Sequence, residues 1–530
     1  MNFIEAIKEK YMKNKETFNF CLIVTFVLGL ITHAYMFFQD SFSHDGLNEL
    51  NADIFGNEWR IQLGRFAVPL YRALTRGNMS VPWLIGVISL LWIALSVYLT
   101  VKIFDIKTKP LIVLTAGIFA TNVAVIATTA TYIHDLDSNM FALFLSVCAV
   151  YLWKKYKFGF LVAIPIVTIS LGMYQAYVSV TITLIIIHLI LDLLKGSKFQ
   201  DVFVKGIKGV TSLAVGGIIY FVLYKAILFL TEIPEVQGKY NTMDQLGSGG
   251  ILGIIKTSVY VFKATLYAFF FPKNAISKNL VFILIVLSFV TAAIIICLKI
   301  FSKKIGILEK VLLLALVAVM PIGMGISGIL SGNLGHDLMR FSDWLIFLFV
   351  LLLVYSVSDV NSENREKNKK GIWLFLSKAI CIVTVVVILM GNVVSANEIY
   401  LKKDLEQDSN LVFFTRVVDR MDCLEGYDRK TNRVVFVGRP DYYDENTAGF
   451  NNGYEIVGAT GNYVLGAAGV GWYQRYFEYK LHYPITMVEA TEVEEYSKKD
   501  FVKEMPTFPD EGCMQMVDDV LVVKLGEIKD

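Results

Sequence analysis

Three short polar stretches of this chain combine carboxylates with histidine or arginine, the side chains best suited to acid–base chemistry beside an anion. The longest is QDSFSHDGLNELNADIFGNEWRIQLGRF at 39–66, and two shorter ones, HDLD at 134–137 and HDLMR at 336–340, repeat its His-Asp pair. A carboxylate can accept the proton of a hydroxyl nucleophile, and an arginine can bind a phosphate through two parallel hydrogen bonds. If the three stretches face the same side of a membrane, they can form one polar site.

Asp45 is the first candidate for a general base. It follows His44 in the sequence SHDG at 43–46, a few residues after a long apolar run. The alternative is a helix cap, because serine, aspartate and glycine are common where one helix ends and another begins. The density of acids at 39–66 and the matching His-Asp pairs elsewhere favour the general base.

Asp135 and Asp137 form the second candidate pair, directly after His134. Asp137 or Ser138 could cap the helix that follows, which would leave Asp135 for catalysis. Carboxylates two residues apart could also bind a divalent cation such as Mg²⁺ or Mn²⁺ through oxygen ligands. The sequence leaves the metal unknown.

Arginine supplies all the positive charge between residues 39 and 81. Arg65 and Arg340 adjoin acidic stretches at the start of apolar runs, so we expect both to bind a phosphate. Arg72 and Arg76 are expected to be solvated or to contact lipid headgroups. The candidate substrate-binding residues are the basic side chains of the three stretches: His44, Arg60, Arg65, His134, His336 and Arg340.

The composition excludes a soluble globular protein and gives no sign of nucleic-acid binding. Of the 530 residues, 55% are hydrophobic and 18% charged, and the formal net charge is +2. The sequence has no GxxxxGKS or GxxxxGKT, no GxGxxG followed by a βαβ pattern, and no DxD within a soluble nucleotide-binding domain. We therefore expect no cytoplasmic nucleotide site. The six cysteines lack metal-like spacing, although Cys423 and Cys513 could pair if the tail lies outside the cell.

Long apolar runs predict a polytopic α-helical membrane protein, since a spanning helix needs about 20 apolar residues. Eleven runs qualify when shorter helices are allowed: 18–38, 82–104, 111–131, 139–153, 158–171, 175–194, 210–230, 279–299, 308–330, 341–357 and 372–394. Another run, 251–271, is interrupted by Lys256 and Lys263, so we expect an interfacial or re-entrant helix there.

Charge sets the predicted orientation of these helices. With the N-terminus in the cytoplasm, the inner loops hold 21 Lys and Arg in 62 residues, and the outer loops hold 10 in 111. This asymmetry obeys the positive-inside rule, whereas a span at 251–271 would place Lys299, Lys303 and Lys304 outside. All three polar stretches and the C-terminal tail then face the outside.

The tail differs in character from the rest of the chain. Apolar, β-branched segments alternate with turns rich in glycine and asparagine, which predicts strands at 434–437, 485–488 and 520–523. A helix is expected at about 405–424. We therefore predict two domains, a transmembrane catalytic domain at 1–394 and a small extracytoplasmic α/β domain at 395–530.

This arrangement resembles membrane glycosyltransferases of the GT-C fold, and more closely the GtrII-type glucosyltransferase family of bacterial membranes. The residues that carry the resemblance are SHDG at 43–46, EWR at 58–60 with LGRF at 63–66, and the second stretch with Asp135 and Asp137. Together with the number of predicted helices, they extend the resemblance over residues 1 to about 395.

The resemblance implies a donor in which the sugar is linked to a polyprenyl phosphate, and a base at the position of Asp45. Such an enzyme would move a hexose, glucose by the family's name, to a cell-surface glycan at the outer face of the bacterial cell membrane, with inversion. The lipid-linked sugar, the glycan acceptor and membrane lipid would be its partners. The alternatives are a transporter or flippase of lipid-linked glycans and a polysaccharide polymerase or ligase. Charges that crowd the outer boundary rather than the spans favour the transferase over the transporter.

Overall fold

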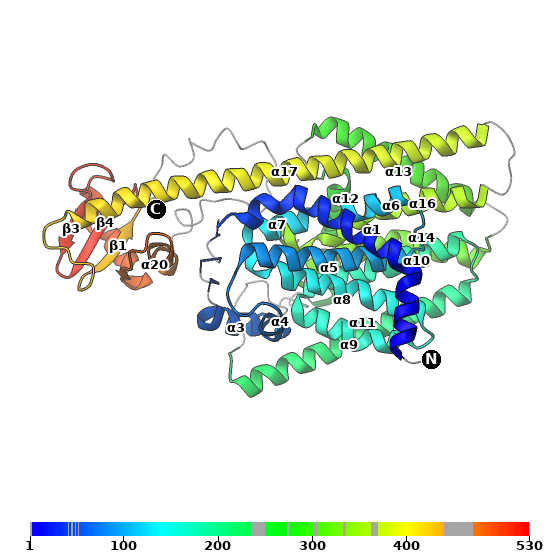
Figure 1. Cartoon of the computed structure of the whole chain (residues 1–530), viewed down its shortest axis with the longest axis horizontal. Helices are drawn as coiled ribbons and strands as arrows, with labels where there is room; N and C mark the ends of the chain where they lie inside the picture. Colours follow the sequence, from blue (N-terminus) through cyan, green and yellow to red (C-terminus); the bar gives the residue numbers. More distant parts are fainter. Residues whose placement is uncertain are drawn as a thin grey trace.

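The computed structural model describes residues 3–40, 42–43, 46–47, 49–50, 52–234, 250–272, 276–301, 305–331, 335–361, 369–438 and 470–528. Most of these residues form a bundle of long helices, and the last of them form a small α/β unit at one end of the bundle (Figure 1). The N-terminus lies at the opposite end of the bundle (Figure 1).

The bundle contains the helices that the hydropathy pattern predicts. Its helices are α1 (Phe3–Phe38), α3 (Ala52–Gln62), α4 (Ala67–Thr75), α5 (Pro82–Ile103), α6 (Lys109–Ala120), α7 (Val123–Thr131), α8 (Leu136–Lys155), α9 (Gly159–Met173), α10 (Val178–Leu194), α11 (Phe199–Thr231), α12 (Gly250–Phe270), α13 (Lys278–Ile300), α14 (Ile307–Met324), α15 (Ile326–Ser331), α16 (Leu345–Asn361) and α17 (Lys369–Asp422). The 3₁₀ turns are η1 (Ile133–Asp135), η2 (Gln175–Tyr177), η4 (Asp337–Met339) and η5 (Phe341–Trp344).

Nine helical segments of the described chain are long and apolar enough to cross a membrane, and two shorter apolar ones are Gly159–Met173 and Phe341–Ser356. Each of the eleven predicted runs coincides with helical residues. The protein is therefore a polytopic helical membrane protein. The interrupted run at 251–271 forms the continuous helix α12, which is not among the nine.

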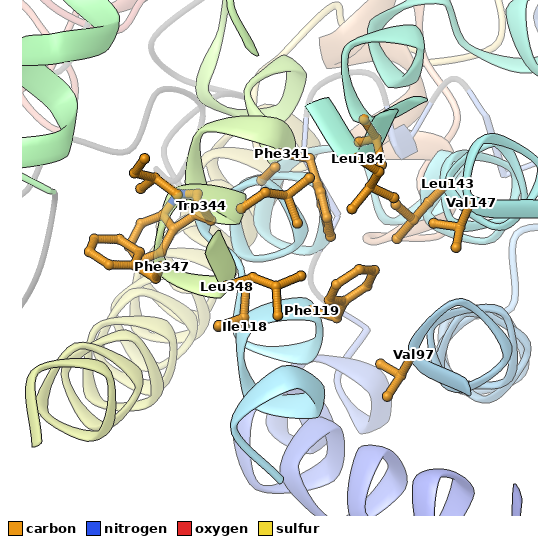
Figure 2. Packing of buried hydrophobic residues seen from close by; sticks show 14 of the residues in the cluster. Val97, Ile118, Phe119, Leu143, Val147, Leu184, Phe341, Trp344, Phe347 and Leu348 are labelled. Atoms are coloured by element: carbon orange, nitrogen blue, oxygen red, sulfur yellow. The ribbon is translucent and has the colours of Figure 1, made fainter. Parts of the chain in front are cut away.

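Apolar side chains from α5, α6, α8, α10, η5 and α16 pack together in the centre of the bundle (Figure 2). The rings of Phe119 and Phe341 meet edge to face, with their centroids 5.4 Å apart. Helices α6 and α7 lie inside the bundle, where 94% of the residues in their most apolar stretch are buried. Lipid tails are as apolar as leucine, so close van der Waals packing of this kind is what holds helices together in a membrane.

The third apolar run, 111–131, is a broken helix whose freed backbone groups are bound by side chains. The break lies at Thr121–Asn122, where α6 ends and Asn122 caps α7 by accepting a hydrogen bond from the amide of Ala124. His33 of α1 donates to the carbonyl of Ala120 at 2.8 Å, and Asn392 of α17 donates to the carbonyl of Thr121 at 2.9 Å. Because unsatisfied carbonyls are costly in a membrane, these two helices stabilise the break.

The far end of α7 is held in the same way. The buried ammonium of Lys403 donates to the carbonyl of Ala130, and the hydroxyl of Ser43 donates to the carbonyl of Thr131. The chain runs directly from Thr131 into the turn η1, so these bonds fix the position of that turn.

The C-terminal unit is a four-stranded sheet in the order β2-β1-β4-β3. Its elements are β1 (Arg433–Val437), α20 (Val470–Tyr479), β2 (Thr486–Met487), α21 (Ala490–Lys498), α22 (Asp500–Glu504), β3 (Met514–Val517) and β4 (Val520–Lys524). The central strand β1 runs parallel to β2 and β4, and β3 is antiparallel to β4. The three predicted strands thus coincide with β1, β2 and β4.

Helix α17 connects the bundle to the sheet without a break. It spans 54 residues and runs along the whole bundle into the C-terminal unit (Figure 1). The predicted domain boundary at 394/395 falls inside it, and the helix expected at 405–424 is its last part. The thiols of Cys423 and Cys513 are both free; the first is exposed and the second buried.

Candidate active site

A buried ion cluster joins the first polar stretch to the second. Arg60 Nε and Arg72 Nη2 donate to Asp135 Oδ1 at 3.0 and 2.8 Å. The same two arginines reach Glu49, whose carboxylate oxygens lie 3.1 Å from Arg60 Nη2 and 3.0 Å from Arg72 Nη1. All four side chains are buried. Two arginines thus bridge two carboxylates from loops that are far apart in the sequence.

The charges of this cluster explain why the Glu49 carboxyl is ionised. Burial raises the pKa of the Glu49 carboxyl, but its basic neighbours Arg60, His134 and Arg72 together outweigh burial, and the net effect lowers that pKa. Glu49 is therefore a fixed negative charge that orients the arginines.

Arg72 lies in α4 and Arg76 is the residue that caps the C-terminus of α4, and both point into the turn η1. The carbonyl of His134 accepts hydrogen bonds from Arg72 Nη2 at 3.2 Å and Arg76 Nη2 at 2.7 Å. Their side chains are 0% and 1% exposed, so the expectation that they are solvated or contact headgroups is wrong. The reason is that the turn η1 presents a free carbonyl and carboxylates that satisfy both guanidinium groups.

Asp137 does not cap the helix that follows it, although the sequence suggested that it could. Helix α8 begins at Leu136, and the Asp137 carboxylate accepts a hydrogen bond from Arg76 Nε at 2.8 Å. Ser138 does not cap the helix either, because its hydroxyl donates to the carbonyl of Asp135. Because arginines already bind the carboxylates of Asp135 and Asp137, this geometry favours a positioning role for both acids over proton transfer.

Arg65 is the arginine of this cluster that is least engaged by carboxylates. Its Nη1 lies 3.6 Å from Asp135 Oδ2, and its guanidinium stacks over the ring of Tyr174 at 4.3 Å from the centroid. Its side chain is 20% exposed, and its Nε has no hydrogen-bond partner among the described residues. Stacking on an aromatic face fixes the guanidinium plane while leaving its N–H groups free to bind an anion.

Aromatic rings connect Arg65 with the third polar stretch. The ring of Tyr174 lies 5.8 Å from that of Tyr177, which in turn lies 5.8 Å from that of Phe341, measured between centroids. Phe341 directly follows Arg340, so the two predicted phosphate-binding arginines lie at the two ends of one aromatic row.

Arg340 lines a cavity of about 620 Å³ between α12 and the segment η4–η5–α16. The aromatic lining residues are Tyr260, Tyr267, Phe269, Phe271, Trp344 and Phe347, and the ionisable ones are Lys263, Asp337, Arg340 and Asp343. Most of the wall is therefore apolar, with a few charges at fixed places, as in many ligand sites. Arg340 Nη2 lies 2.6 Å from Asp343 Oδ2.

One face of α12 forms a wall of this cavity. Tyr260, Lys263, Tyr267 and Phe271 follow one another at intervals of three or four residues, which places them on the same side of the helix. Lys263 forms no ion pair with any residue that the structure describes. The lysine that interrupted the apolar run in the sequence thus adds a positive charge to the cavity.

The predicted site residues fall into four groups. Arg60, Arg65, His134, Asp135 and Asp137 come together in the arginine cluster, and Arg340 lies at the cavity. The exposed His336 is not part of the cavity wall. The remaining two, His44 and Asp45, lie outside the described residues.

Further residues, Glu49 among them, belong to the site but were not predicted to. Tyr174, Lys263 and Asp343 appear in no short motif. Arg72 and Arg76, in contrast, are four residues apart, and this spacing places both on one face of a helix. That spacing could have indicated a shared target for the two arginines.

No group of three or more His, Cys, Asp and Glu side chains is arranged to hold a metal ion within the part of the chain that the structure describes. Asp135 and Asp137, the predicted ligands, each bind arginine instead. An oxygen site for Mg²⁺ or Mn²⁺ needs carboxylates that are free to coordinate, and these two do not meet that condition.

The C-terminal unit packs on the first polar stretch. Phe42 and Leu47 are buried in one hydrophobic cluster with Phe414 of α17 and Tyr476 of α20. Lys480, at the end of α20, pairs with Asp40 at 2.6 Å. The sheet and the arginine cluster therefore lie at the same end of the bundle.

Comparison with known proteins identifies a family. Residues 34–353 match the family model described as Glucosyl transferase GtrII. The matched region includes the three polar stretches, the arginine cluster and the cavity, and it ends before α17. No curated protein and no solved structure matches the chain.

Proposed function

The chain belongs to the GtrII glucosyltransferase family, and we propose that it transfers a hexose from a polyprenyl-phosphate donor to a cell-surface glycan. The observation that carries this proposal is the cavity beside α12, which combines an apolar wall with Arg340 and Lys263. Such a site suits a ligand with a long apolar tail and one anionic group. It accords with the absence of nucleotide-binding motifs in the sequence.

The donor phosphate would bind between the cationic groups of the site. Arg340 and Lys263 line the cavity, and Arg65 lies at the other end of the aromatic row. Arginine donors aimed at the phosphate stabilise the negative charge that develops as polyprenyl phosphate leaves. The apolar face of α12, with Tyr267 and Phe271, would contact the first part of the polyprenyl chain.

In the proposed reaction, Asp45 takes the proton of an acceptor hydroxyl while the hydroxyl oxygen attacks the anomeric carbon. The bond between that carbon and the phosphate oxygen breaks, and polyprenyl phosphate leaves with the electron pair. One direct displacement inverts the anomeric configuration. Ser43 and Glu49, on either side of Asp45 in the sequence, contact Thr131 and the arginines around Asp135. The first stretch is thus anchored to the second stretch before and after Asp45.

Replacing Arg65 or Arg340 by lysine is expected to lower kcat/KM about 10- to 100-fold, because lysine keeps the charge but cannot form two parallel hydrogen bonds to phosphate. The matched control is Arg420→Lys, since Arg420 is exposed on α17 and, among the described residues, donates to the carbonyl of Pro509. Steady-state kinetics with varied donor concentration measure the effect. Unchanged kinetics in both lysine variants would show that neither arginine binds the phosphate.

We further propose that the N-terminus is cytoplasmic and the site extracytoplasmic, on the positive-inside distribution of lysine and arginine. Single cysteines at Thr108 and Thr491, both exposed, test this orientation in a chain whose own six cysteines are replaced. Thr491→Cys should react with a membrane-impermeant maleimide in intact cells, and Thr108→Cys only after permeabilisation. Reaction of both positions from the same side would refute the topology.

The donor class is tested by incubating the purified protein with radiolabelled polyprenyl-phosphate hexoses and, separately, with UDP-hexoses. We expect turnover with a polyprenyl-phosphate hexose, glucose first, and none with the nucleotide sugars. The anomeric configuration of the product, read by NMR, should be opposite to that of the donor. Turnover of UDP-glucose alone would contradict the proposed donor, and the same assay in EDTA determines whether a divalent cation contributes.

A further inference from the structure

Asp343 has a buried carboxylate to which the proposed reaction assigns no role. It lies in η5, is 7% exposed and lines the cavity beside α12. Its Oδ2 lies 2.6 Å from Arg340 Nη2. Its Oδ1 accepts no hydrogen bond from any residue that the structure describes. One oxygen of the carboxylate is thus paired with Arg340, and the other has no hydrogen-bond donor among the described residues.

Two hydrogen bonds hold η5 immediately before Asp343, which limits how far its carboxylate can move toward another partner. Asn122 donates to the carbonyl of Phe341 at 3.2 Å, and the hydroxyl of Ser342 donates to the carbonyl of Met324 at 2.7 Å. A buried carboxylate oxygen without a donor carries a desolvation penalty, and such groups in native proteins commonly have a functional reason. The fixed geometry therefore points to a ligand that brings a hydrogen-bond donor.

The chemistry of the cavity narrows the class of this ligand. A phosphate oxygen offers no proton to Asp343 and is repelled by its charge, whereas a sugar hydroxyl can donate to Oδ1. The rings of Tyr260, Tyr267 and Trp344 line the same cavity and provide broad apolar surfaces around the charged groups. A hexose linked to a phosphate would satisfy both residues of the Arg340–Asp343 pair. The phosphate would bind Arg340, and a sugar hydroxyl would donate a hydrogen bond to Asp343.

We propose that Asp343 Oδ1 accepts a hydrogen bond from one hydroxyl of the donor hexose and thereby determines which sugar is transferred. This inference rests on the proposed function, because it places the hexose of a phosphate-linked donor in the cavity. Asp343 is a specificity residue in this account, and the proton of the acceptor still goes to Asp45.

A thermodynamic cycle tests the proposal in the intact protein. Polyprenyl-phosphate hexoses that lack one hydroxyl each are compared with the parent donor, first in the wild type and then in Asp343→Ala and Asp343→Asn. Removing the contacted hydroxyl should lower kcat/KM of the wild type about 10- to 100-fold, the usual effect of losing a hydrogen bond to a charged group. In Asp343→Ala that same deletion should change kcat/KM by less than about threefold. In Asp343→Asn, which keeps the side-chain shape, the same deletion should lower kcat/KM by an intermediate factor.

A binding measurement separates this inference from the proposed transfer reaction. A ten-carbon prenyl phosphate, with and without an attached hexose, is titrated into wild type and variants by calorimetry. The wild type should bind the hexose form more tightly, and Asp343→Ala should lose that preference. The matched control Lys263→Met should weaken both ligands equally and keep their ratio.

The outcomes distinguish the two claims. An Asp343-dependent hexose preference in a protein that transfers no sugar would uphold the inference and refute the transferase. Equal binding of both prenyl phosphates by the wild type would overturn the inference, and so would a hexose preference that survives in both Asp343 variants. Wild-type rates that are the same for every deoxy donor would likewise overturn it.

Discussion

Replacing Asp45 by asparagine should lower the rate of hexose transfer by about 100- to 10,000-fold, the usual effect of removing a general base. Asparagine keeps the shape of the side chain and its hydrogen bonding but cannot accept a proton at neutral pH. A lost helix cap would instead cost about 1 kcal/mol of stability and leave the chemistry intact. The variant should therefore be expressed normally and bind the donor, yet release little polyprenyl phosphate.

Asp40→Asn is the matched control for this experiment. Asp40 belongs to the same stretch, its side chain is 86% exposed, and it pairs with Lys480 of the C-terminal unit. Its removal should change the transfer rate by no more than a few-fold. If Asp45→Asn transfers sugar at nearly the wild-type rate while Asp135→Asn is inactive, the base belongs to the second stretch.

Replacing Arg72 by methionine should lower the free energy of unfolding by about 3–5 kcal/mol, because breaking a buried ion pair leaves uncompensated charge. The side chain of Arg72 is fully buried and binds Glu49, Asp135 and the carbonyl of His134. Without it, Glu49 and Asp135 share fewer positive partners, and the carbonyl of His134 in η1 loses one of its two arginine donors. Thermal unfolding in detergent and reversible unfolding in bicelles measure the loss.

Arg65→Met provides the comparison for Arg72→Met within the same cluster. Arg65 is partly exposed and lies 3.6 Å from its nearest carboxylate oxygen, so we expect its removal to cost at most about 1 kcal/mol of stability. Its effect should appear in donor kinetics instead. Equal stability of Arg72→Met and the wild type would show that the cluster does not hold the two loops together.

The sequence was sufficient to predict the helices and three of the strands, because hydropathy and alternation are local properties. The runs that end at residues 104 and 194 coincide with α5 and α10. The break at Thr121–Asn122 could not be predicted, since no proline or glycine marks it and its carbonyls are bound by His33 and Asn392 from distant helices.

The candidate site was predictable only in part, for a similar reason. Grouping acids and arginines identified Arg65, Asp135 and Arg340, all of which lie in the arginine cluster or the cavity. Local sequence could not show that Arg72 is buried, because two of its partners, Asp135 and the carbonyl of His134, lie on a turn more than 60 residues away. Nor could it show that α12 faces the third stretch, which is what makes Lys263 part of the cavity.

The central claim is that this protein breaks the bond between a hexose and a polyprenyl phosphate and passes the sugar to a glycan. The direct measurement is the stoichiometry in sealed proteoliposomes that contain a doubly labelled polyprenyl-phosphate hexose and an external glycan acceptor. We predict one polyprenyl phosphate released for each hexose that enters the acceptor, at a rate abolished by Asp45→Asn. Movement of intact lipid-linked hexose across the membrane, with no polyprenyl phosphate released, would contradict the claim and identify a flippase.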